Sequence, residues 1–275
     1  MTYREAMRIG TQVLTEAEVA DAAIDSWYLL EYICRITRSY YYLHENDDLT
    51  EEQQNDFESA IKKRAERIPF QYITGIQEFM GLKFHVNSSV LIPRQDTETL
   101  VEEALKVLTP EMKVLDVCTG SGCIIISLAD KVPGITASAS DISKQALLVA
   151  KDNGKLHETA VEWIRSDLFE NIDGTFDMIV SNPPYIRTAD ITELMPEVRD
   201  FEPYDALDGT EDGLFFYRKI VSESSEYLNE GGFLYLEIGY DQAEDVSQMM
   251  REAGFEQIEV VKDLAGLDRV VKGRK

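Results

Sequence analysis

The chain contains little cysteine and little histidine, and it has no long apolar run. Its three cysteines, Cys34, Cys118 and Cys123, form neither an even disulfide set nor a metal-ligand spacing, which excludes a disulfide-stapled scaffold and a zinc ribbon. The three histidines are isolated in the sequence, so we assign no metal ligand. No apolar run approaches the roughly 18 residues of a transmembrane helix, and the first residues lack the apolar segment of a secretory signal. We therefore expect a cytoplasmic protein with reduced thiols and no membrane partner.

Basic residues are also scarce. Lys and Arg number 27 against 51 Asp and Glu, which gives a formal net charge of −24 at pH 7. Such a surface repels the phosphate backbone, so we expect no direct binding to long nucleic acid. The charge favours a basic or ribosome-associated protein partner through electrostatic steering. Acidity that serves only solubility fits the composition equally well.

At 275 residues the chain is long enough for two domains. Residues 1–68 repeat apolar side chains every three or four positions, which predicts a small helical domain. Asp48 or Thr50 can cap its last helix, which ends before Pro69. The aromatic segment 40–44 can form a contact surface or supply core packing, and we expect it to pack between these helices.

Residues 69–95 change in character and predict a β-hairpin linker. Short strands are expected over 70–75 and 79–86, around turns. Arg94 and Glu98 stand four positions apart at the following helix start. They can pair with each other or shape a binding cleft, and we expect the pair.

Residues 96–275 alternate helices and strands, which predicts an α/β domain with a mostly parallel sheet and helices on both faces. Asp96 or Thr97 can cap its first helix, over 100–108. The expected strands cover 114–117, 135–140, 161–164, 176–180, 233–238, 257–262 and 269–272. Gly231 and Gly232 predict a turn before the fifth of these strands.

The strand 178–180 stops at the segment Asn182-Pro183-Pro184-Tyr185. The prolines fix φ near −65° and hold the preceding residues extended. The side-chain oxygen of Asn182 and the carbonyl of Pro183 can then face one point beside the Tyr185 ring. Two acceptors and an aromatic face suit a planar NH2 group. By itself the segment fits a rigid turn as well as it fits a site.

A glycine-bearing loop follows the first strand of this region. Glycines at such a position let the backbone approach a ligand, and the next helix N-terminus favours an anionic group. Ile125 replaces the third glycine of the dinucleotide fingerprint, which argues against a bound NAD. The P-loop motif is absent, which argues against a P-loop nucleotide site. The candidate cofactor residues here are Asp116, Cys118, Thr119, Gly120, Ser121 and Gly122.

Acidic residues follow the next two strands. Asp141, roughly 20 residues beyond the glycines, is placed to hold two ribose hydroxyls. Asp167 can accept from an adenine amino group, with Leu168 packing on the ring. Each aspartate by itself can also cap a helix, but their position at consecutive strand ends favours a bound nucleoside.

Together these motifs resemble the class I S-adenosylmethionine-dependent methyltransferases, and more narrowly the HemK/PrmC protein-(glutamine-N5) methyltransferases. The resemblance implies a Rossmann-like, mostly parallel seven-stranded sheet, preceded by the helical domain and the hairpin linker. The matching segments are Arg67–Gly75, Leu91–Glu98, Asn182–Ile186, Phe201–Pro203 with Ala206–Leu207, and Leu236–Gly239.

The resemblance implies methyl transfer from S-adenosyl-L-methionine to the N5 amide nitrogen of the Gly-Gly-Gln glutamine in class 1 peptide chain release factors, with S-adenosyl-L-homocysteine as product. It implies Asn182, Pro183, Pro184 and Tyr185 as the catalytic loop, with Asn182 also beside the cofactor. The helical domain is expected to dock the release factor. One residue departs from the family: Cys118 stands where glycine is usual, which predicts strain if that position needs positive φ.

Two other functions are compatible with parts of this sequence. An adenine-N6 or cytosine-N4 DNA methyltransferase can carry the same Asn-Pro-Pro-Tyr segment, but the acidic charge and the lack of a base-extruding domain argue against it. A non-catalytic protein that kept the cofactor-binding fold is the second, and only Cys118 favours it.

Overall fold

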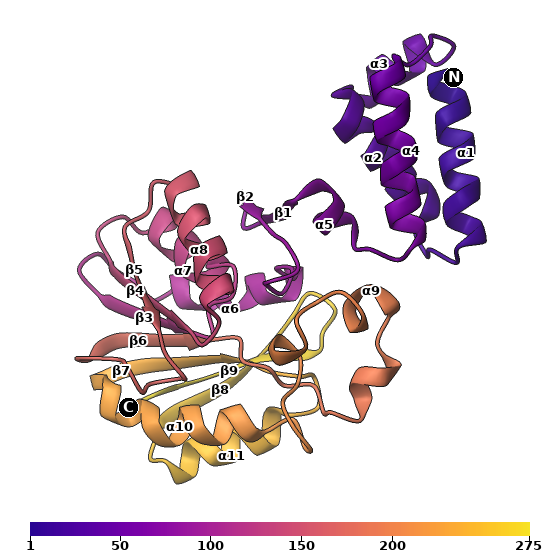
Figure 1. Ribbon diagram of the computed structural model, residues 1–275. Helices are drawn as coiled ribbons and strands as arrows, with labels where there is room; N and C mark the ends of the chain where they lie inside the picture. The colour runs from indigo at the N-terminus through magenta and orange to yellow at the C-terminus, as the bar shows by residue number, and fades with distance from the viewer. The chain divides into compact units, whose positions relative to one another are not determined.

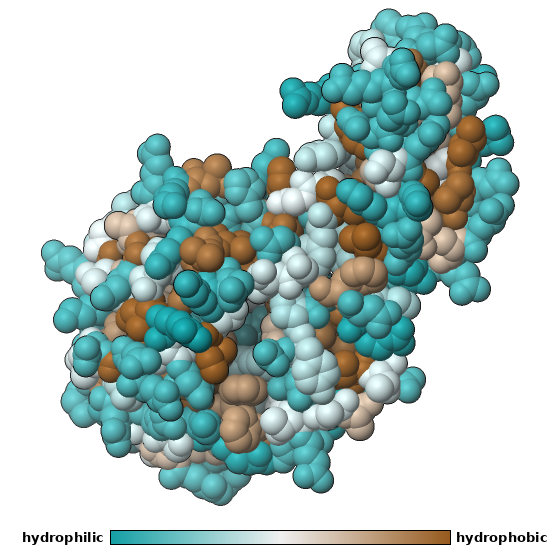
Figure 2. All heavy atoms as spheres, viewed as in Figure 1, coloured by the Kyte–Doolittle hydropathy of each residue, from teal (hydrophilic) through white to brown (hydrophobic).

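The computed structural model describes residues 1–275 and divides into two compact units (Figure 1). The helical unit comprises Met1–Ile76 and Met195–Phe201, and the catalytic unit comprises Gln77–Leu194 and Glu202–Lys275. None of the helices is long and apolar enough to cross a membrane. On the face drawn in Figure 2 the surface of each unit is mostly hydrophilic, with apolar side chains exposed in places.

The helical unit is built from helices around one apolar core. Gly10 lets the first helix approach its neighbours, because a Cβ there would lie 2.5 Å from Ser26 Oγ and 2.8 Å from the Phe57 ring. The helices are α1 (Tyr3–Glu16), α2 (Ala22–Cys34), α3 (Arg38–His44), α4 (Glu51–Ala65) and α5 (Phe70–Thr74).

The predicted cap of the long helix is confirmed at Thr50. Its hydroxyl accepts from the Gln53 backbone N–H, and the Gln53 side chain accepts from Thr50 N in return. This reciprocal capping box satisfies two backbone donors of α4.

The aromatic segment of α3 does not pack between helices as expected. Tyr42 is 66% exposed and Leu43 is 82% exposed, whereas Tyr41 contacts the Trp27 ring edge-on and Tyr40 contacts the Tyr3 ring edge-on. A helix of one to two turns at the surface can direct only one face inward, so the other side chains remain in solvent.

The predicted strand over 70–75 is wrong, since this segment is helix α5. Pro69 stands immediately before the helix, and Gly75 ends it in the left-handed conformation, with φ 74°. A proline at the start and a glycine at the end are helix boundaries. In so short a segment they outweigh the strand preference of its aromatic and β-branched residues.

A second segment belongs to the helical unit although it lies far along the chain. Short helix α9 (Pro196–Arg199) carries Glu197, whose carboxylate pairs with Arg64 at 2.9 Å and with Arg67 at 2.7 Å. Arg64 also pairs with Asp25 on α2 at 2.6 Å. The chain thus leaves the catalytic unit after Leu194 and returns at Glu202.

The hairpin of the linker consists of β1 (Ile76–Phe79) and β2 (Leu82–His85). Met80 and Gly81 join them with φ of 52° and 77°, which is the geometry of a two-residue type I′ turn. Phe79 and Phe84 are almost fully buried in the core of the catalytic unit.

The catalytic unit contains a seven-stranded sheet in the order β5-β4-β3-β6-β7-β9-β8, in which β9 runs antiparallel to both its neighbours. The expected doubly wound fold is therefore confirmed. Its strands are β3 (Lys113–Val117), β4 (Thr136–Asp141), β5 (Val161–Arg165), β6 (Phe176–Ser181), β7 (Leu228–Glu237), β8 (Glu256–Lys262) and β9 (Asp268–Arg274).

Helices cover both faces of the sheet, as Figure 1 shows. One face carries α6 (Glu98–Leu105), α7 (Cys123–Lys131) and α8 (Lys144–Leu156). The other carries α10 (Phe215–Tyr227) and α11 (Ala243–Glu252). Short 3-10 turns η1 (Gln95–Thr97), η2 (Asp190–Glu193) and η3 (Tyr204–Ala206) complete the chain.

The turn predicted at Gly231 and Gly232 is absent, because both glycines lie inside β7. The pairing of β6 with β7 shifts register between Phe176 and Met178, and Gly231 has φ 78°. An irregularity of this kind lets a strand bend without ending.

Candidate functional site

The sheet brings the sequence motifs to one edge. Strand order reverses between β3 and β6, and ligands of doubly wound folds bind at such a switch point. Val117 pairs with Ser181, and Ser181 pairs with Leu236. Since these strands are parallel, the residues after these three positions lie on the same edge, and these are Cys118, Asn182 and Glu237, the last residue of β7. Ser181 Oγ donates to the Val117 carbonyl at 2.6 Å and ties two of the strand ends together.

The Asn-Pro-Pro-Tyr segment is held from behind by its backbone. The buried Gln242 side chain donates to the Tyr185 carbonyl at 3.0 Å and to the Gly213 carbonyl at 3.2 Å. Gly209 allows this packing, because a Cβ there would lie 2.7 Å from Tyr185 Cα. The loop is therefore fixed by residues that lie beyond it in sequence, none of which was predicted.

The Asn182 amide is anchored by Thr97, a residue that the sequence predicts as a helix cap. Thr97 was predicted as a helix cap, yet neither η1 nor α6 has a side-chain cap bond. Instead the Thr97 hydroxyl, 2% exposed, accepts from Asn182 Nδ2 at 3.3 Å. The cap prediction is wrong because a 3-10 turn precedes α6, and the hydroxyl bonds across the sheet edge instead.

Tyr185 and Glu237 meet beside this amide. The Tyr185 hydroxyl donates to Glu237 Oε1 at 3.4 Å, and Glu237 is 1% exposed. Burial, opposed by hydrogen bonding from Thr97 and by the charge of Arg269, raises the pKa of Glu237 to about 7. Burial also raises the pKa of Tyr185, so this phenol stays protonated at neutral pH. The Glu237 carboxylate thus interacts with Tyr185, which belongs to the loop 182–185, and with Thr97, which holds Asn182 of that loop. We call the loop 182–185 the acceptor loop.

The expected pair between Arg94 and Glu98 does not form. Arg94 pairs with the buried Glu202 at 2.6 Å, and Glu98 accepts from the Met80 backbone N–H at 2.6 Å. Residue 94 precedes the 3-10 turn in extended backbone, so the two side chains are not on successive turns of one helix.

The loop after β3 has the positive φ at Cys118 for which the sequence predicts backbone strain. Cys118 lies in the left-handed region with φ 62°, where a side chain costs about 1–2 kcal/mol. Gly120 and Gly122 also have positive φ. A Cβ on Gly120 would meet no atom within 4 Å, so its backbone faces open space that a ligand can enter. Burial raises the pKa of Cys118, which leaves this thiol a poor nucleophile.

Asp116 lies beneath this loop and is fully buried. Its Oδ2 accepts from the Thr119 hydroxyl at 2.6 Å, whereas its Oδ1 has no partner. Burial, with a smaller contribution from the charge of Asp141, raises its pKa to about 7. An unpaired buried carboxylate oxygen fits a cationic group of a bound ligand.

Asp141 ends β4 beside the same loop. Its Oδ2 accepts from Gly120 N at 2.9 Å and its Oδ1 from Ser143 N at 2.8 Å. The helix cap that follows is Ser143, which bonds Ala146 N at 3.2 Å. Because each carboxylate oxygen has a further lone pair, Asp141 can still accept from ribose hydroxyls.

A pocket of about 390 Å³ opens after β5. Asp167 lines it with a carboxylate that no hydrogen bond or ion pair engages, and Ile142 provides an apolar wall. Leu168 is 6% exposed and packs in the core, so little of its side chain is available to a ring. The other lining residues are Arg165, Ser166, Glu170 and Asn171.

Asn153 of α8 is a further support that sequence reasoning missed. This fully buried amide donates to the Ser121 carbonyl at 2.9 Å and to the His85 carbonyl at 3.0 Å, and accepts from His85 N at 2.7 Å. Asn153 therefore joins the glycine-bearing loop after β3 to the end of the β1–β2 hairpin.

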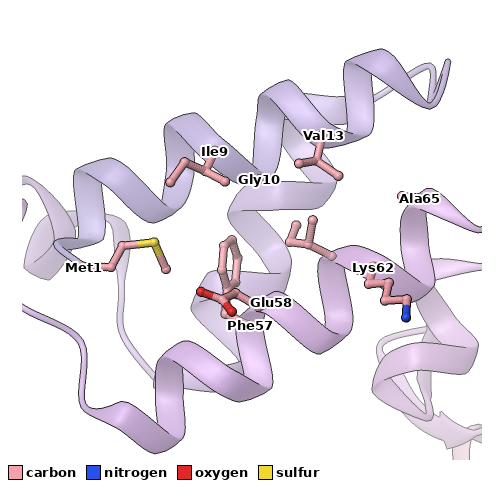
Figure 3. A pocket seen from close by; sticks show the side chains of 9 residues that line it. Met1, Ile9, Gly10, Val13, Phe57, Glu58, Lys62 and Ala65 are labelled. Carbon is pink, nitrogen blue, oxygen red and sulfur yellow. The ribbon is translucent and has the colours of Figure 1, made fainter.

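A separate cavity of about 280 Å³ lies between α1 and α4 in the helical unit (Figure 3). Its lining is apolar, with Ile9, Val13 and Phe57 turned toward one another and Glu58 and Lys62 on α4 nearby. It contains no group suited to methyl transfer, so the candidate active site is the sheet edge.

Glu237 had a sequence signal of its own. It is the one charged residue in the apolar strand 233–238 and lies at its carboxyl end, where a buried charge needs a partner. Thr97, Gln242 and Asn153 had no such signal, because polar residues at helix starts and on helix faces are ordinary.

Comparison with known proteins agrees with this geometry. The family described as PrmC N-terminal domain matches residues 5–75, and that described as Methyltransferase small domain matches residues 95–197. A crystal structure of a methyltransferase from Pyrococcus furiosus shares the fold, with a TM-score of 0.55 at 16% identity over 82% of this chain and 99% of that one.

Two curated relatives match almost end to end. The release factor glutamine methyltransferase of Geobacter sulfurreducens is 43% identical over 99% of this chain and 96% of its own length. That of Clostridium acetobutylicum is 42% identical over 98% of both. With this identity, and with the acceptor and glycine loops on neighbouring strand ends, the chain belongs to the release factor glutamine methyltransferase family.

Proposed function

We propose that this protein transfers a methyl group from S-adenosyl-L-methionine to the N5 amide nitrogen of the Gly-Gly-Gln glutamine in class 1 release factors. The observation that carries the proposal is the Asn-Pro-Pro-Tyr loop after β6 directly beside the glycine loop after β3. The names of the full-length relatives support the choice of protein substrate.

The cofactor, when bound, supplies a methyl group made electrophilic by its sulfonium. The chain's own residues fit it: Gly120 faces open space, and Asp116 Oδ1 is buried without a partner. We assign Asp141 to the ribose hydroxyls and Asp167 to the adenine amino group, with only the small exposed part of Leu168 left to contact the ring. The loop residues Cys118, Thr119, Gly120, Ser121 and Gly122 would line the methionine part.

The acceptor is a glutamine amide, whose nitrogen lone pair is delocalised into its carbonyl. Asn182 Oδ1 and the Pro183 carbonyl would accept its two N–H bonds and thereby raise electron density on the nitrogen. Pro183 and Pro184 keep the loop rigid, and Tyr185 holds the amide plane from one face. Orientation and electrostatics account for the rate without a strong base, and the proton leaves the nitrogen late.

The helical unit is assigned to release-factor docking in the cytoplasm. Its exposed side chains Tyr42 and Leu43 offer an apolar contact surface on α3. The net charge of −24 disfavours direct binding of nucleic acid. Docking away from the reacting atoms lets remote binding energy position a glutamine held on a large protein.

The purified protein should be incubated with S-adenosyl-L-methionine, a class 1 release factor and a duplex DNA control, followed by peptide mass spectrometry. A single methyl on the Gly-Gly-Gln glutamine is the expected result. Label on the DNA alone would replace the proposal with adenine methylation. Bound cofactor without label anywhere would indicate a binding protein.

A further inference from the structure

Glu237 is a buried carboxylate at the level of the acceptor loop. It directly follows Leu236, which pairs with Ser181, so Glu237 and Asn182 leave adjacent strands side by side. The Tyr217 hydroxyl donates to its backbone carbonyl at 2.9 Å and fixes the strand end. A carboxylate in this place needs partners, and only its Oε2 lacks one.

Its partners form a directional chain. Asn182 Nδ2 donates to the Thr97 hydroxyl at 3.3 Å. The Thr97 hydroxyl also lies close enough to the Glu237 carboxylate to lower the pKa of that group by hydrogen bonding. Tyr185 donates to the same carboxylate at 3.4 Å. An ionised carboxylate only accepts, and a hydroxyl has a single proton. Thr97 must therefore donate to Glu237, which leaves its lone pairs to accept from the NH2 end of Asn182.

We propose that Thr97 and Glu237 are positioning residues that select one of the two flips of the Asn182 amide and present its Oδ1 to the substrate. The opposite flip would place an NH2 group against the NH2 group of the glutamine and leave the Pro183 carbonyl as its only acceptor. The same carboxylate holds the Tyr185 ring in place. This inference rests on the proposed function, because it concerns the orientation of the amide that receives the glutamine.

The charge state of Glu237 sets the direction of this chain. The groups that face it are Thr97, Tyr185, Arg269 and Asp96, together with Tyr217 and Cys123. Arg269 favours the ionised form, whereas burial favours the neutral form. A protonated Glu237 can donate, and the Thr97 proton is then free to turn toward Asn182 and reverse the amide. Turnover should accordingly fall as the pH drops below about 7.

The first test compares Thr97→Val with Thr97→Ser in the full-length protein. Valine keeps the shape and removes the hydroxyl, so we expect kcat to fall about 10- to 100-fold with cofactor affinity unchanged. Serine restores the hydroxyl and should recover most of the rate. Ser247→Ala is the matched control, because Ser247 is a buried hydroxyl on α11 without a partner. A wild-type rate for Thr97→Val would overturn the proposal.

A second test does not depend on activity. The side-chain amide of Asn182, assigned in ¹⁵N-labelled protein by its loss in Asn182→Ala, should exchange slowly in the wild type and rapidly in Thr97→Val. If the amide is protected but the release factor is not methylated, the proposed function fails and the positioning stands. Equal exchange in both proteins, with methylation intact, overturns the positioning.

The third variant is Glu237→Gln, which remains informative if Thr97→Val does not fold. It removes the titrating group, so the fall in kcat between pH 8 and pH 6 should flatten. A wild-type pH profile for this variant would contradict the assigned role of Glu237.

Discussion

At the residue scale the proposed chemistry depends on one amide oxygen. Asn182→Ala removes Oδ1, one of two acceptors for the glutamine amide, and kcat should fall about 10²- to 10³-fold, as for other groups that stabilise developing charge. The dissociation constant of S-adenosyl-L-methionine, measured by calorimetry, should stay within a factor of a few.

Asn229→Ala is a suitable control for that variant. Asn229 is also a hydrogen-bonded amide, at 2.7 Å from Asp177, but it lies at the opposite end of β7. Near-wild-type turnover by Asn182→Ala would remove Asn182 from the mechanism.

Asp116 predicts a pH-dependent cofactor affinity. Its pKa is raised to about 7 by burial, and a cationic ligand favours the ionised carboxylate. The affinity should therefore rise about tenfold from pH 6 to pH 8, with proton release on binding, which calorimetry in buffers of different ionisation enthalpy measures. Asp116→Asn should lose this component, and an unchanged pH dependence in that variant would assign it to the ligand instead.

At the element scale, α9 is attached to the helical unit by charge. Burial raises the pKa of Glu197, but hydrogen bonds from Arg67 and Arg64 outweigh it and lower the pKa to about 2. A depressed acid pKa stabilises the folded state above the unfolded value near 4.5, and that stabilisation is lost as the pH falls toward 2. The contribution is on the order of 1–3 kcal/mol, because solvent near the ion pairs screens part of their attraction.

We therefore expect the helical unit to lose stability between pH 4.5 and pH 2, measured by urea unfolding at each pH. Glu197→Gln should be less stable at pH 7 and should lose most of this pH dependence. The exposed pair of Arg199 and Asp200 nearby offers a control, since Asp200→Asn should change little. Equal curves for Glu197→Gln and the wild type would show that the ion pairs do not hold α9.

At the scale of the whole molecule, docking and chemistry are assigned to different units. Leu43→Ser removes an apolar side chain that is 82% exposed on α3. Since burying a leucine contributes about 1.5–3 kcal/mol, KM for the intact release factor should rise about tenfold, with kcat and cofactor affinity unchanged. Steady-state kinetics with a titrated release factor measure both.

Leu264→Ser is the matched control, because Leu264 is 95% exposed in the catalytic unit. The Leu43→Ser variant should methylate a short Gly-Gly-Gln peptide with the same kcat and KM as the wild type. An unchanged KM for the release factor would move the docking surface elsewhere.

Part of this organisation follows from local sequence patterns. The alternation of helices and strands predicts the sheet, because side-chain periodicity depends only on neighbouring residues. Asn182, Asp116 and Asp141 were found because each lies at or near the carboxyl end of a strand, and parallel strand ends share one edge. The capping box of Thr50 is equally local, since it involves residues three positions apart.

Local patterns also account for the errors. Segment 70–75 contains strand-forming residues, but its flanking Pro69 and Gly75 decide for a helix. Thr97 has the composition of a cap, yet its hydroxyl finds a better-placed donor 85 residues away. Arg94 likewise pairs with Glu202 instead of its sequence neighbour.

The sequence by itself therefore determined the fold class and the two loops that carry the proposed chemistry, because rigid prolines, positive-φ glycines and apolar periodicity act over a few residues. Only the tertiary structure decided how the Asn182 amide is turned and why α9 joins the helical unit. Those depend on pairs separated by 85 and 130 residues, and such contacts form only when strand register and burial bring distant polar groups together without water to satisfy them.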